Sequence, residues 1–259
     1  MSSLRVFAVG GLLSYRALFA WARPSLYIPT LLGSPLFQIL FFAYVGRNAR
    51  FQDDSFFVVG NAVQVSAMAG VYGMAMAIGG ERVTGTLSAV LSSPASRAAL
   101  FLGRAMPYVL NGILVSTFGF VVGRLLLDFH PAASSIPALA LVIVVSAASS
   151  TALGGLLGAL ALRSRDVLVL ANVVYFLMLL FCGVNVPLHE LPGWMAAIGR
   201  ALPLTHGIEA GRAVVAGKAL PVRLIVTELG VGAVYATAGY LLFRLFEAEG
   251  RRRATLEIV

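Results

Sequence analysis

The sequence predicts an all-α membrane protein in which six transmembrane helices form one domain over residues 1–259. Of these residues, 59% are hydrophobic and 12% are charged, and the mean hydropathy is +0.90. A soluble domain carries about 25% charged residues, so this chain has too few to cover a water-facing surface. Its apolar residues form runs close to the length of about 20 that crosses a bilayer. They do not alternate with polar residues as in a membrane β-barrel, so each run is expected to be a helix.

The N-terminal segment, residues 1–24, carries three arginines on one side of a helix. Arg5, Arg16 and Arg23 fall within roughly 20° of one azimuth at about 100° per residue. We expect an interfacial helix on the cytoplasmic leaflet. An irregular tail whose arginines reach toward water is the alternative.

The spans follow this segment in order. We expect them at residues 27–45, 55–79, 105–127, 137–162, 167–186 and 222–246. With six spans both termini share a side, and twelve of the 19 lysines and arginines fall on it, against seven on the other. This bias predicts cytoplasmic termini, as for a protein of a bacterial inner or plasma membrane. The pairs Gly119/Gly123 and Gly154/Gly158 favour close helix packing.

An exterior segment at 187–221 is too polar for a span yet keeps apolar residues at helical spacing, interrupted by prolines. The apolar residues are Leu191, Trp194, Met195, Ile198 and Leu202, and the interruptions are Pro192 and Pro203. We expect a broken amphipathic hairpin that is re-entrant, as a lid over a pathway, because irregular backbone at membrane depth needs protein or a water-filled cavity around it. A plain interfacial helix is the alternative.

Catalytic and metal-binding patterns are missing from the sequence. His130, His189 and His206 are far apart, fit no metal-ligand spacing and are expected to be ordinary loop histidines. Lys218 is the only lysine and is not followed by Ser or Thr, so the chain has no phosphate-binding P-loop. We therefore expect no enzyme activity, metal or cofactor in this chain. The net charge of +8 is dispersed and no groove-reading motif accompanies it, which argues against nucleic-acid binding.

Ionisable residues inside the expected spans are few. Glu228 and Arg124 lie in apolar sequence near expected outer ends, where a snorkelling or capping role fits each. A relay of protons along the chain's own carboxylates is therefore not expected, which points to an energy source in another protein.

The loop at 80–98 joins the second and third spans on the cytoplasmic side. Its second half favours a short helix with Leu87, Val90 and Leu91 on one face, ending before Pro94. Such a face is buried either in a groove of a partner protein or against lipid.

Two stretches resemble the ATP-binding-cassette type-2 exporter permeases. The first is this loop, with Glu81-Arg82, Gly85-Thr86-Leu87, Leu91, Ser93-Pro94, Arg97 and Leu102-Gly103-Arg104. The second is Pro203-Leu204-Thr205-His206 followed by Glu209 and Arg212. The number of spans and the interfacial and exterior segments are also similar, so the resemblance covers nearly the whole chain.

The resemblance implies a permease that pairs with an ATPase subunit, which holds ATP and magnesium, and with a second permease copy, either identical or a paralogue. The loop would be the coupling helix seated in the ATPase. The implied contacts are Glu81, Gly85, Thr86, Leu87, Leu91 and Arg97. At Val83 and Ser88 the sequence departs from the family, in which an acid is frequent.

Polar positions on two spans mark a candidate substrate path, because the resemblance places the second and fifth spans along the pathway. One helical face carries Asn61, Gln64, Met68 and Tyr72, and the other carries Asn172, Tyr175 and Phe176. Amide, phenol and thioether groups suit an amphipathic or apolar substrate. Interhelical packing is the alternative explanation of these residues.

The sequence thus predicts ATP-driven export of a hydrophobic or amphipathic compound such as a drug, an antibiotic or another natural product. Export of a lipid or lipid-linked glycan is an alternative. A membrane scaffold that docks a cytosolic partner without transport is the alternative from another class.

Overall fold

The computed structural model describes residues 24–83, 97–163 and 166–253, and every regular element in this part of the chain is a helix. This confirms the all-α prediction for the described residues. The α-helices are α2 (Pro24–Ala49), α3 (Asp54–Val83), α5 (Arg97–Leu126), α6 (Ile136–Ala161), α7 (Val167–Phe181), α8 (Gly193–Ala201), α9 (Thr205–Val215) and α10 (Val222–Arg253), with 3₁₀ turns η1 (Ala133–Ser135) and η2 (Leu188–Glu190).

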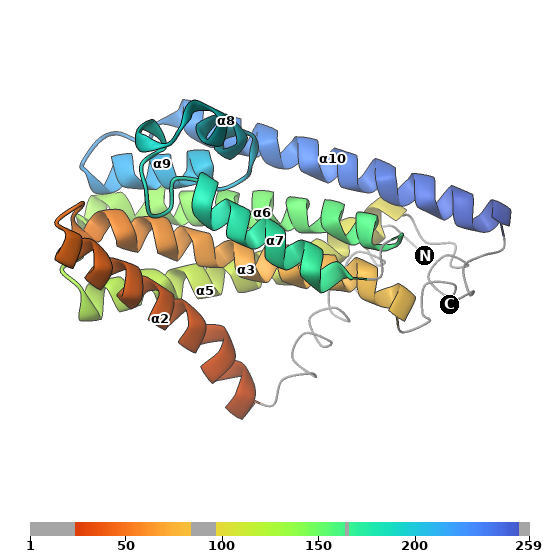
Figure 1. Ribbon diagram of the computed structural model, residues 1–259, viewed down its shortest axis with the longest axis horizontal. Coiled ribbons are helices and arrows are strands. Elements are labelled where there is room, and N and C mark those ends of the chain that lie inside the picture. The colour runs from red at the N-terminus through yellow and green to blue at the C-terminus, as the bar shows by residue number, and fades with distance from the viewer. Residues whose placement is uncertain (1–23, 84–96, 164–165, 254–259) are drawn as a thin grey trace.

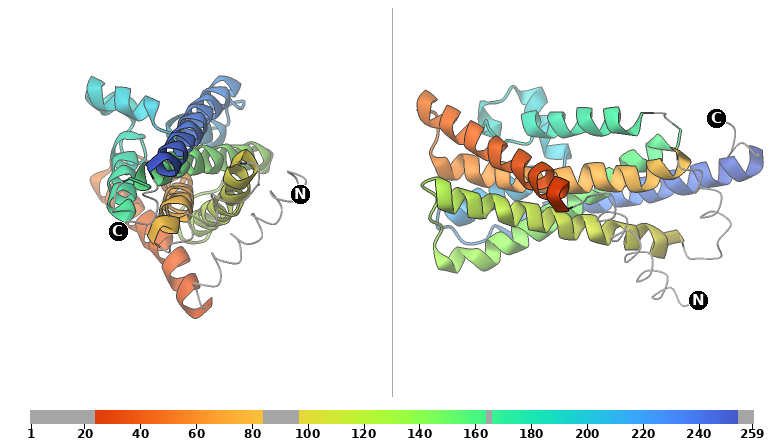
Figure 2. Two further views of the ribbon diagram at one scale, coloured as in Figure 1. Left: turned by 90° about the vertical axis from the view of Figure 1, so that its right-hand side faces the viewer. Right: turned by 90° about the horizontal axis from the view of Figure 1, so that it is seen from below.

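Helix α3 is the centre of the bundle. It packs against α2, α5, α6, α7 and α9, and α10 covers the far side of α6 (Figure 1). Within its apolar window α3 is 72% buried, against 17% for α10. Helix α2 leans away from the bundle toward its N-terminal end, as Figure 1 and the left view of Figure 2 show. The short helices α8 and α9 lie at the end of the bundle where α2 and α5 end and α10 begins.

Glycines allow the central helices to approach closely. A Cβ built on Gly154 would lie 2.4 Å from the Gly70 carbonyl oxygen, and one on Gly158 would lie 3.0 Å from that of Ala75, so α6 packs directly on the α3 backbone. On the other side of α3, a Cβ on Gly123 would lie 2.4 Å from the Val58 side chain. The prediction that these small residues serve close packing is confirmed.

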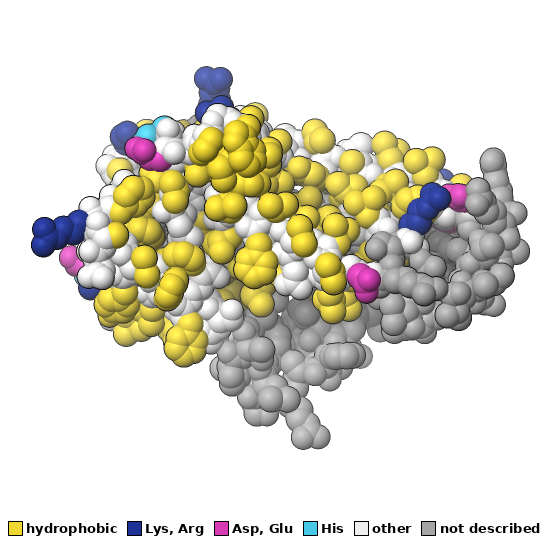
Figure 3. All heavy atoms as spheres, viewed as in Figure 1, with side chains coloured by type: hydrophobic (Ala, Val, Ile, Leu, Met, Phe, Trp, Pro, Cys, Tyr) yellow, Lys and Arg dark blue, Asp and Glu magenta, His cyan; other side chains and the backbone are white. Residues whose placement is uncertain are grey.

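Four described helices are long and apolar enough to cross a membrane, namely α3, α5, α6 and α10. Their outer surface is largely hydrophobic, as expected for helices that face lipid (Figure 3). Helix α2 is also 26 residues long. Helix α5 begins at Arg97 rather than near residue 105, and α3 continues past 79 to Val83, so both helices extend beyond the predicted spans.

The fifth predicted span, 167–186, is too long. Helix α7 ends at Phe181 after 15 residues, which is about 22 Å of helix and short of the hydrocarbon core. The reason is Gly183, whose φ of +73° is the left-handed conformation that commonly ends a helix. Most of residues 182–186 are apolar, so run length alone extended the predicted span through this turn.

Two predicted features lie outside the described residues. The interfacial helix at 1–24 falls almost wholly in residues 1–23. Of the loop at 80–98, the structure gives only the backbone of its two ends, where Glu81 continues α3 and Arg97 begins α5.

The segment at 187–221, which the sequence predicts to be exterior, is helical on both sides of the predicted breaks. Helix α8 starts directly after Pro192, and α9 starts two residues after Pro203. The amphipathic character is strong: Trp194 on α8 is 62% exposed, whereas most of α9 is buried against α3, α6 and α10.

Candidate functional site

Seven polar side chains form a continuous seam between α3, α7 and α2. We call them the polar ladder: Gln38, Asn61, Gln64, Tyr72, Asn172, Tyr175 and Asn185. At one end of the seam, the Tyr72 hydroxyl donates to Asn172 Oδ1 at 2.7 Å. At the other end, Asn61 Nδ2 donates to Asn185 Oδ1 at 2.8 Å.

Gln38 of α2 connects the middle of the ladder. Its Nε2 donates to Asn61 Oδ1 at 3.0 Å, and its Oε1 accepts from the Tyr175 hydroxyl at 3.3 Å. Gln64 Nε2 donates to the Tyr175 carbonyl oxygen at 3.4 Å, while Gln64 Oε1 is buried without a hydrogen-bond partner among the described residues. The middle of the ladder is therefore packed, with one acceptor that no described residue uses, whereas Asn172 at its end is exposed.

The structure brings together five of the seven residues predicted for the substrate path. Met68 is half-buried and packs into the apolar core beside them, and Phe176 points outward with 61% of its surface exposed. Sequence reasoning missed Gln38 and Asn185. Gln38 is the only amide in the first apolar run and could have been found by that signal, but Asn185 was hidden by the wrong end of the fifth span.

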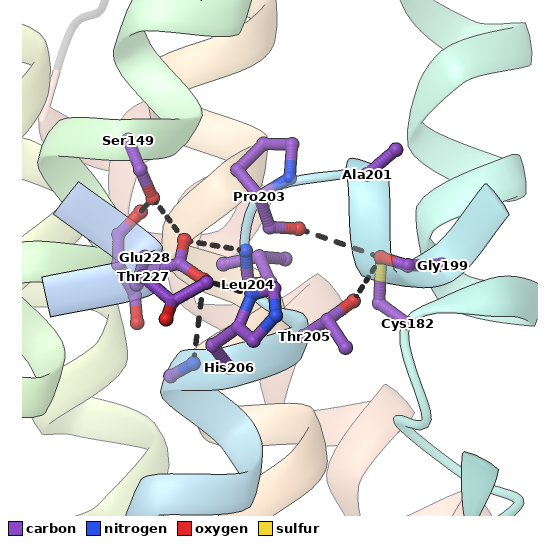
Figure 4. Close-up of polar contacts among 12 residues, drawn as sticks. Ser149, Cys182, Gly199, Ala201, Pro203, Leu204, Thr205, His206, Thr227 and Glu228 are labelled. Atoms are coloured by element: carbon purple, nitrogen blue, oxygen red, sulfur yellow. Dashed lines mark hydrogen bonds and ion pairs between the residues drawn. The ribbon is translucent and has the colours of Figure 1, made fainter. Parts of the chain in front are cut away.

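The second buried polar group lies where the exterior segment meets the bundle (Figure 4). We call it the anchor cluster: Ser149, Leu204, His206, Gly207 and Glu228. The Glu228 side chain is fully buried, and its Oε1 accepts from the Ser149 hydroxyl and from the Leu204 N–H at 2.7 Å. Its Oε2 accepts from the Gly207 N–H at 3.3 Å and lies 3.6 Å from His206 Nδ1.

Glu228 caps α9 from a different helix. Leu204 stands at the N-cap of α9, where its side chain cannot accept a hydrogen bond, and the Thr205 hydroxyl donates instead to the Gly199 carbonyl oxygen. The first N–H groups of a helix need acceptors, and a carboxylate also interacts favourably with the helix dipole. The capping role suggested for Glu228 is confirmed, although the carboxylate is buried rather than close to water.

The prediction that His206 is an ordinary loop histidine is wrong. It lies in the first turn of α9 and is buried against Glu228, because the chain turns inward at Leu204 with a φ of +82°. Gly207 permits this approach, since a Cβ there would lie 2.1 Å from Ser146 Oγ. His130 and His189 are exposed beside neighbouring acids, as expected of loop histidines.

Arg212 ties the other end of α9 to the bundle. Its guanidinium donates to the carbonyl oxygens of Gly183 and Val184, both at 2.7 Å, and lies 3.4 Å from the centre of the Phe56 ring. Burial lowers the pKa of Arg212 to about 9, while Glu209 and Asp53 act in the opposite direction. The guanidinium therefore keeps its charge at neutral pH and fixes α9 to the turn after α7.

An apolar groove of about 310 Å³ lies between α5 and α6, with Phe120, Leu139 and Ile143 in its wall and Arg124, which is exposed, at its edge. In the described part of the chain, no three His, Cys, Asp or Glu side chains lie close enough together to hold a metal ion.

A bundle of long apolar helices with buried neutral polar seams defines an integral membrane protein. The family model described as "ABC-2 type transporter" matches residues 10–215. The chain therefore belongs to the ABC-2 type transporter family and is the membrane component of an ABC transporter, and this family implies an ATPase partner. The comparison with curated proteins gave no match.

Proposed function

We propose that this chain is the permease subunit of an ATP-driven exporter that moves a hydrophobic or amphipathic compound out of the cytoplasm. The observation that carries the proposal is the polar ladder. It provides neutral amide and phenol groups along the seam between two helices that the family resemblance places on the pathway. A drug, antibiotic or other natural product is the proposed substrate class.

The chemistry of the ladder suits such a substrate. Amides and hydroxyls both donate and accept, so they can exchange hydrogen bonds with a ligand that carries a few polar groups. The Tyr72 and Tyr175 rings, with centroids 5.6 Å apart, add apolar and aromatic surface. Ladder side chains carry no charge, so an uncharged or weakly charged ligand would not leave a buried ion unpaired.

The loop between α3 and α5 is the proposed site of coupling to the ATPase. We propose that Glu81, Gly85, Thr86, Leu87, Leu91 and Arg97 contact the ATPase, and that two permease copies of six spans each, with cytoplasmic termini, form the transporter. Closure of the ATPase can change the state of the membrane part only through contacts that differ between the two states. A short helix in this loop would transmit them to α3, which carries Asn61 and Tyr72.

The experiment is transport by membrane vesicles that contain this chain and its ATPase. Leu87→Ala is expected to abolish most of the ATP-dependent export and of the stimulation of ATP hydrolysis, because it removes the central apolar contact. Ser92→Ala, in the same loop but outside the proposed contacts, is the matched control. Export that continues without the ATPase would exclude the coupled mechanism, and a stable complex without transport would identify a scaffold.

The six-span topology has its own test. Cys182 is the only cysteine and is buried, so background labelling is low. Cysteines introduced as Ser55→Cys and Ser164→Cys are expected to react with an impermeant reagent from opposite sides of the membrane. Labelling of both from one side would contradict the topology.

A further inference from the structure

His206 and Glu228 are the only described histidine–carboxylate pair in which both partners are buried. Glu228 is 0% exposed and His206 is 9% exposed, whereas His130 and His189 pair with exposed acids. Glu228 lies on α10, outside the residues matched by the family model, and His206 lies inside them. The pair therefore joins the exterior segment to a helix that the family description does not cover.

Three polar groups hold the two oxygens of Glu228, namely the Ser149 hydroxyl and the N–H groups of Leu204 and Gly207. Glu228 thus presents a fixed acceptor on the inner side of His206.

His206 faces this acceptor with a nitrogen that has no hydrogen bond. Nδ1 is buried and lies 3.6 Å from Glu228 Oε2, and the side chain is 11% exposed, so it still reaches the surface. A lone pair on Nδ1 directed at the carboxylate is repelled, whereas an N–H, and above all an imidazolium, is attracted. Proton binding at His206 therefore strengthens its contact with Glu228.

Few other ionisable groups surround the pair. Helix α6 has no ionisable side chain and contributes Ser149. Cys182 after α7 is buried, and the Tyr235 hydroxyl on α10 donates to the Ala201 carbonyl oxygen. The cations of the neighbouring elements, Arg200 on α8 and Arg223 on α10, are exposed.

On α9 itself, the remaining charges lie away from Glu228. The Arg212 guanidinium is bound to Gly183 and Val184 at the other end of the helix. Glu209 is partly exposed and is electrostatically coupled to Arg212. Within the anchor cluster, His206 is thus the one described ionisable group besides Glu228.

We propose that His206 is a proton-binding site that controls how firmly the exterior segment is held to the bundle. With the proton bound, the imidazolium pairs with Glu228 and holds the start of α9 against α6 and α10. Without it, the attraction between the two charges is lost, the contact weakens and the segment opens more often. The inference deepens the proposed function, because a segment at the outer end of the pathway would then make export respond to the acidity outside the membrane.

The strained backbone at Leu204 favours the proposal that the segment can open. Its φ of +82° is unfavourable for a leucine, and the conformation persists because Glu228 binds its N–H and its side chain is fully buried. A residue in this region costs of the order of 1–3 kcal/mol and persists only where its surroundings hold it. Weakening one of those contacts therefore favours release of the turn.

Cys182 is a built-in reporter of this opening. Its Sγ donates to the Pro203 carbonyl oxygen at 3.4 Å, and the thiol is fully covered. Movement of residues 203–205 would uncover it. Because thiol reactivity itself depends on pH, each rate is divided by the rate of a variant without the histidine at the same pH.

The experiment measures labelling of Cys182 in the purified full-length protein at pH 5.5 and pH 8. In the wild type, labelling relative to His206→Asn is expected to rise about fivefold or more from pH 5.5 to 8, an effect of about 1 kcal/mol. Glu228→Gln is expected to remove this rise. His189→Asn, a change to an exposed histidine in the same segment, is the control and should keep it.

His206→Lys gives an independent check, because it keeps a positive charge at both pH values. Labelling is expected to remain slow at both. An equal pH response in the wild type and in His206→Asn would overturn the proposal, as would a response that Glu228→Gln leaves intact. No ATPase and no transport enter this assay, so its failure leaves the proposed function standing, and failure of vesicle export leaves the proton site standing.

Discussion

The anchor cluster holds a carboxylate and an imidazole where α9 meets α6 and α10, whereas the polar ladder joins neutral amides and phenols along α3 and α7. The anchor cluster is buried in the apolar bundle, whereas the ladder runs from buried residues such as Asn61 and Gln64 to the exposed Asn172. In the anchor cluster three donors converge on one side chain, Glu228. In the ladder the contacts are mostly pairwise, and one acceptor, Gln64 Oε1, is unused.

The difference follows from the cost of leaving each group without partners. A buried charge that loses its donors is far more costly than a neutral amide that loses one hydrogen bond. Removal of the central acid should therefore disrupt the anchor cluster as a unit, and the ladder should tolerate the loss of single contacts. The anchor cluster thus behaves as a structural joint. The ladder behaves as a surface whose side chains can exchange their hydrogen bonds for contacts with a ligand.

The largest expected effect is that of Glu228→Ala. It leaves the Leu204 and Gly207 N–H groups without acceptors and His206 without its partner, and the loss of one member of a buried ionic cluster costs about 3–5 kcal/mol. Thermal unfolding of the purified protein should show a large fall in Tm. Glu190→Ala, an exposed acid in the same segment, is the control and should stay within about 0.5 kcal/mol. Equal falls in Tm for the two variants would contradict the view that Glu228 holds the anchor cluster together.

Gly207→Ala should have the next largest effect. The new Cβ would lie 2.1 Å from Ser146 Oγ, and overpacking of this kind costs about 1–3 kcal/mol. The double variant Gly207→Ala/Ser146→Ala removes the clashing oxygen and should recover most of the loss in the same unfolding measurement. Gly193→Ala, where no atom lies within 4 Å, is the control. If the double variant is no more stable than the single one, the close approach of α9 to α6 does not explain the loss of stability in Gly207→Ala.

The sequence predicted the helices well and the anchor cluster poorly, for a physical reason. Hydrophobic run length is a local property, so α3, α6 and α10 could be recognised directly. The contact of His206 with Glu228 joins residues on separate helices, and it depends on an inward turn at Leu204. Pro203 predicts a break at this point but not the direction in which the chain turns. Tertiary packing decides such a contact.

The polar ladder was predicted better than the anchor cluster but less completely than the helices. Asn61, Gln64 and Tyr72 share a helical face, so periodicity alone was enough to group them. Their partners Gln38 and Asn185 come from segments whose placement depends on how α2 leans and where α7 ends. Helix faces could be predicted, but the pairing between faces could not.

Tyr72→Phe tests the ladder with a smaller effect on stability. It removes one neutral hydrogen bond to Asn172, worth about 0.5–1.5 kcal/mol. Under the proposed function the same change should weaken export, measured as a higher KM in vesicles, because the hydroxyl would no longer be available to the substrate. Tyr235→Phe, which also removes a hydroxyl hydrogen bond but at the α8 end, is the control and should leave KM unchanged.

Phe176→Ala should have the smallest effect on stability and still test the ladder as a path. Its ring is 61% exposed and contacts Tyr175 edge-on with centroids 6.1 Å apart, so truncation should change stability by no more than about 0.5 kcal/mol. If substrate passes along this face of α7, export of an aromatic compound should fall more than that of an aliphatic one. Leu180→Ala, a change to another exposed residue of the same helix (52% exposed), should not discriminate between them. Equal losses for both compounds in the Phe176 variant would assign the residue to packing against lipid or a second subunit, and the path would then have to be sought on the buried side of the ladder around Gln64.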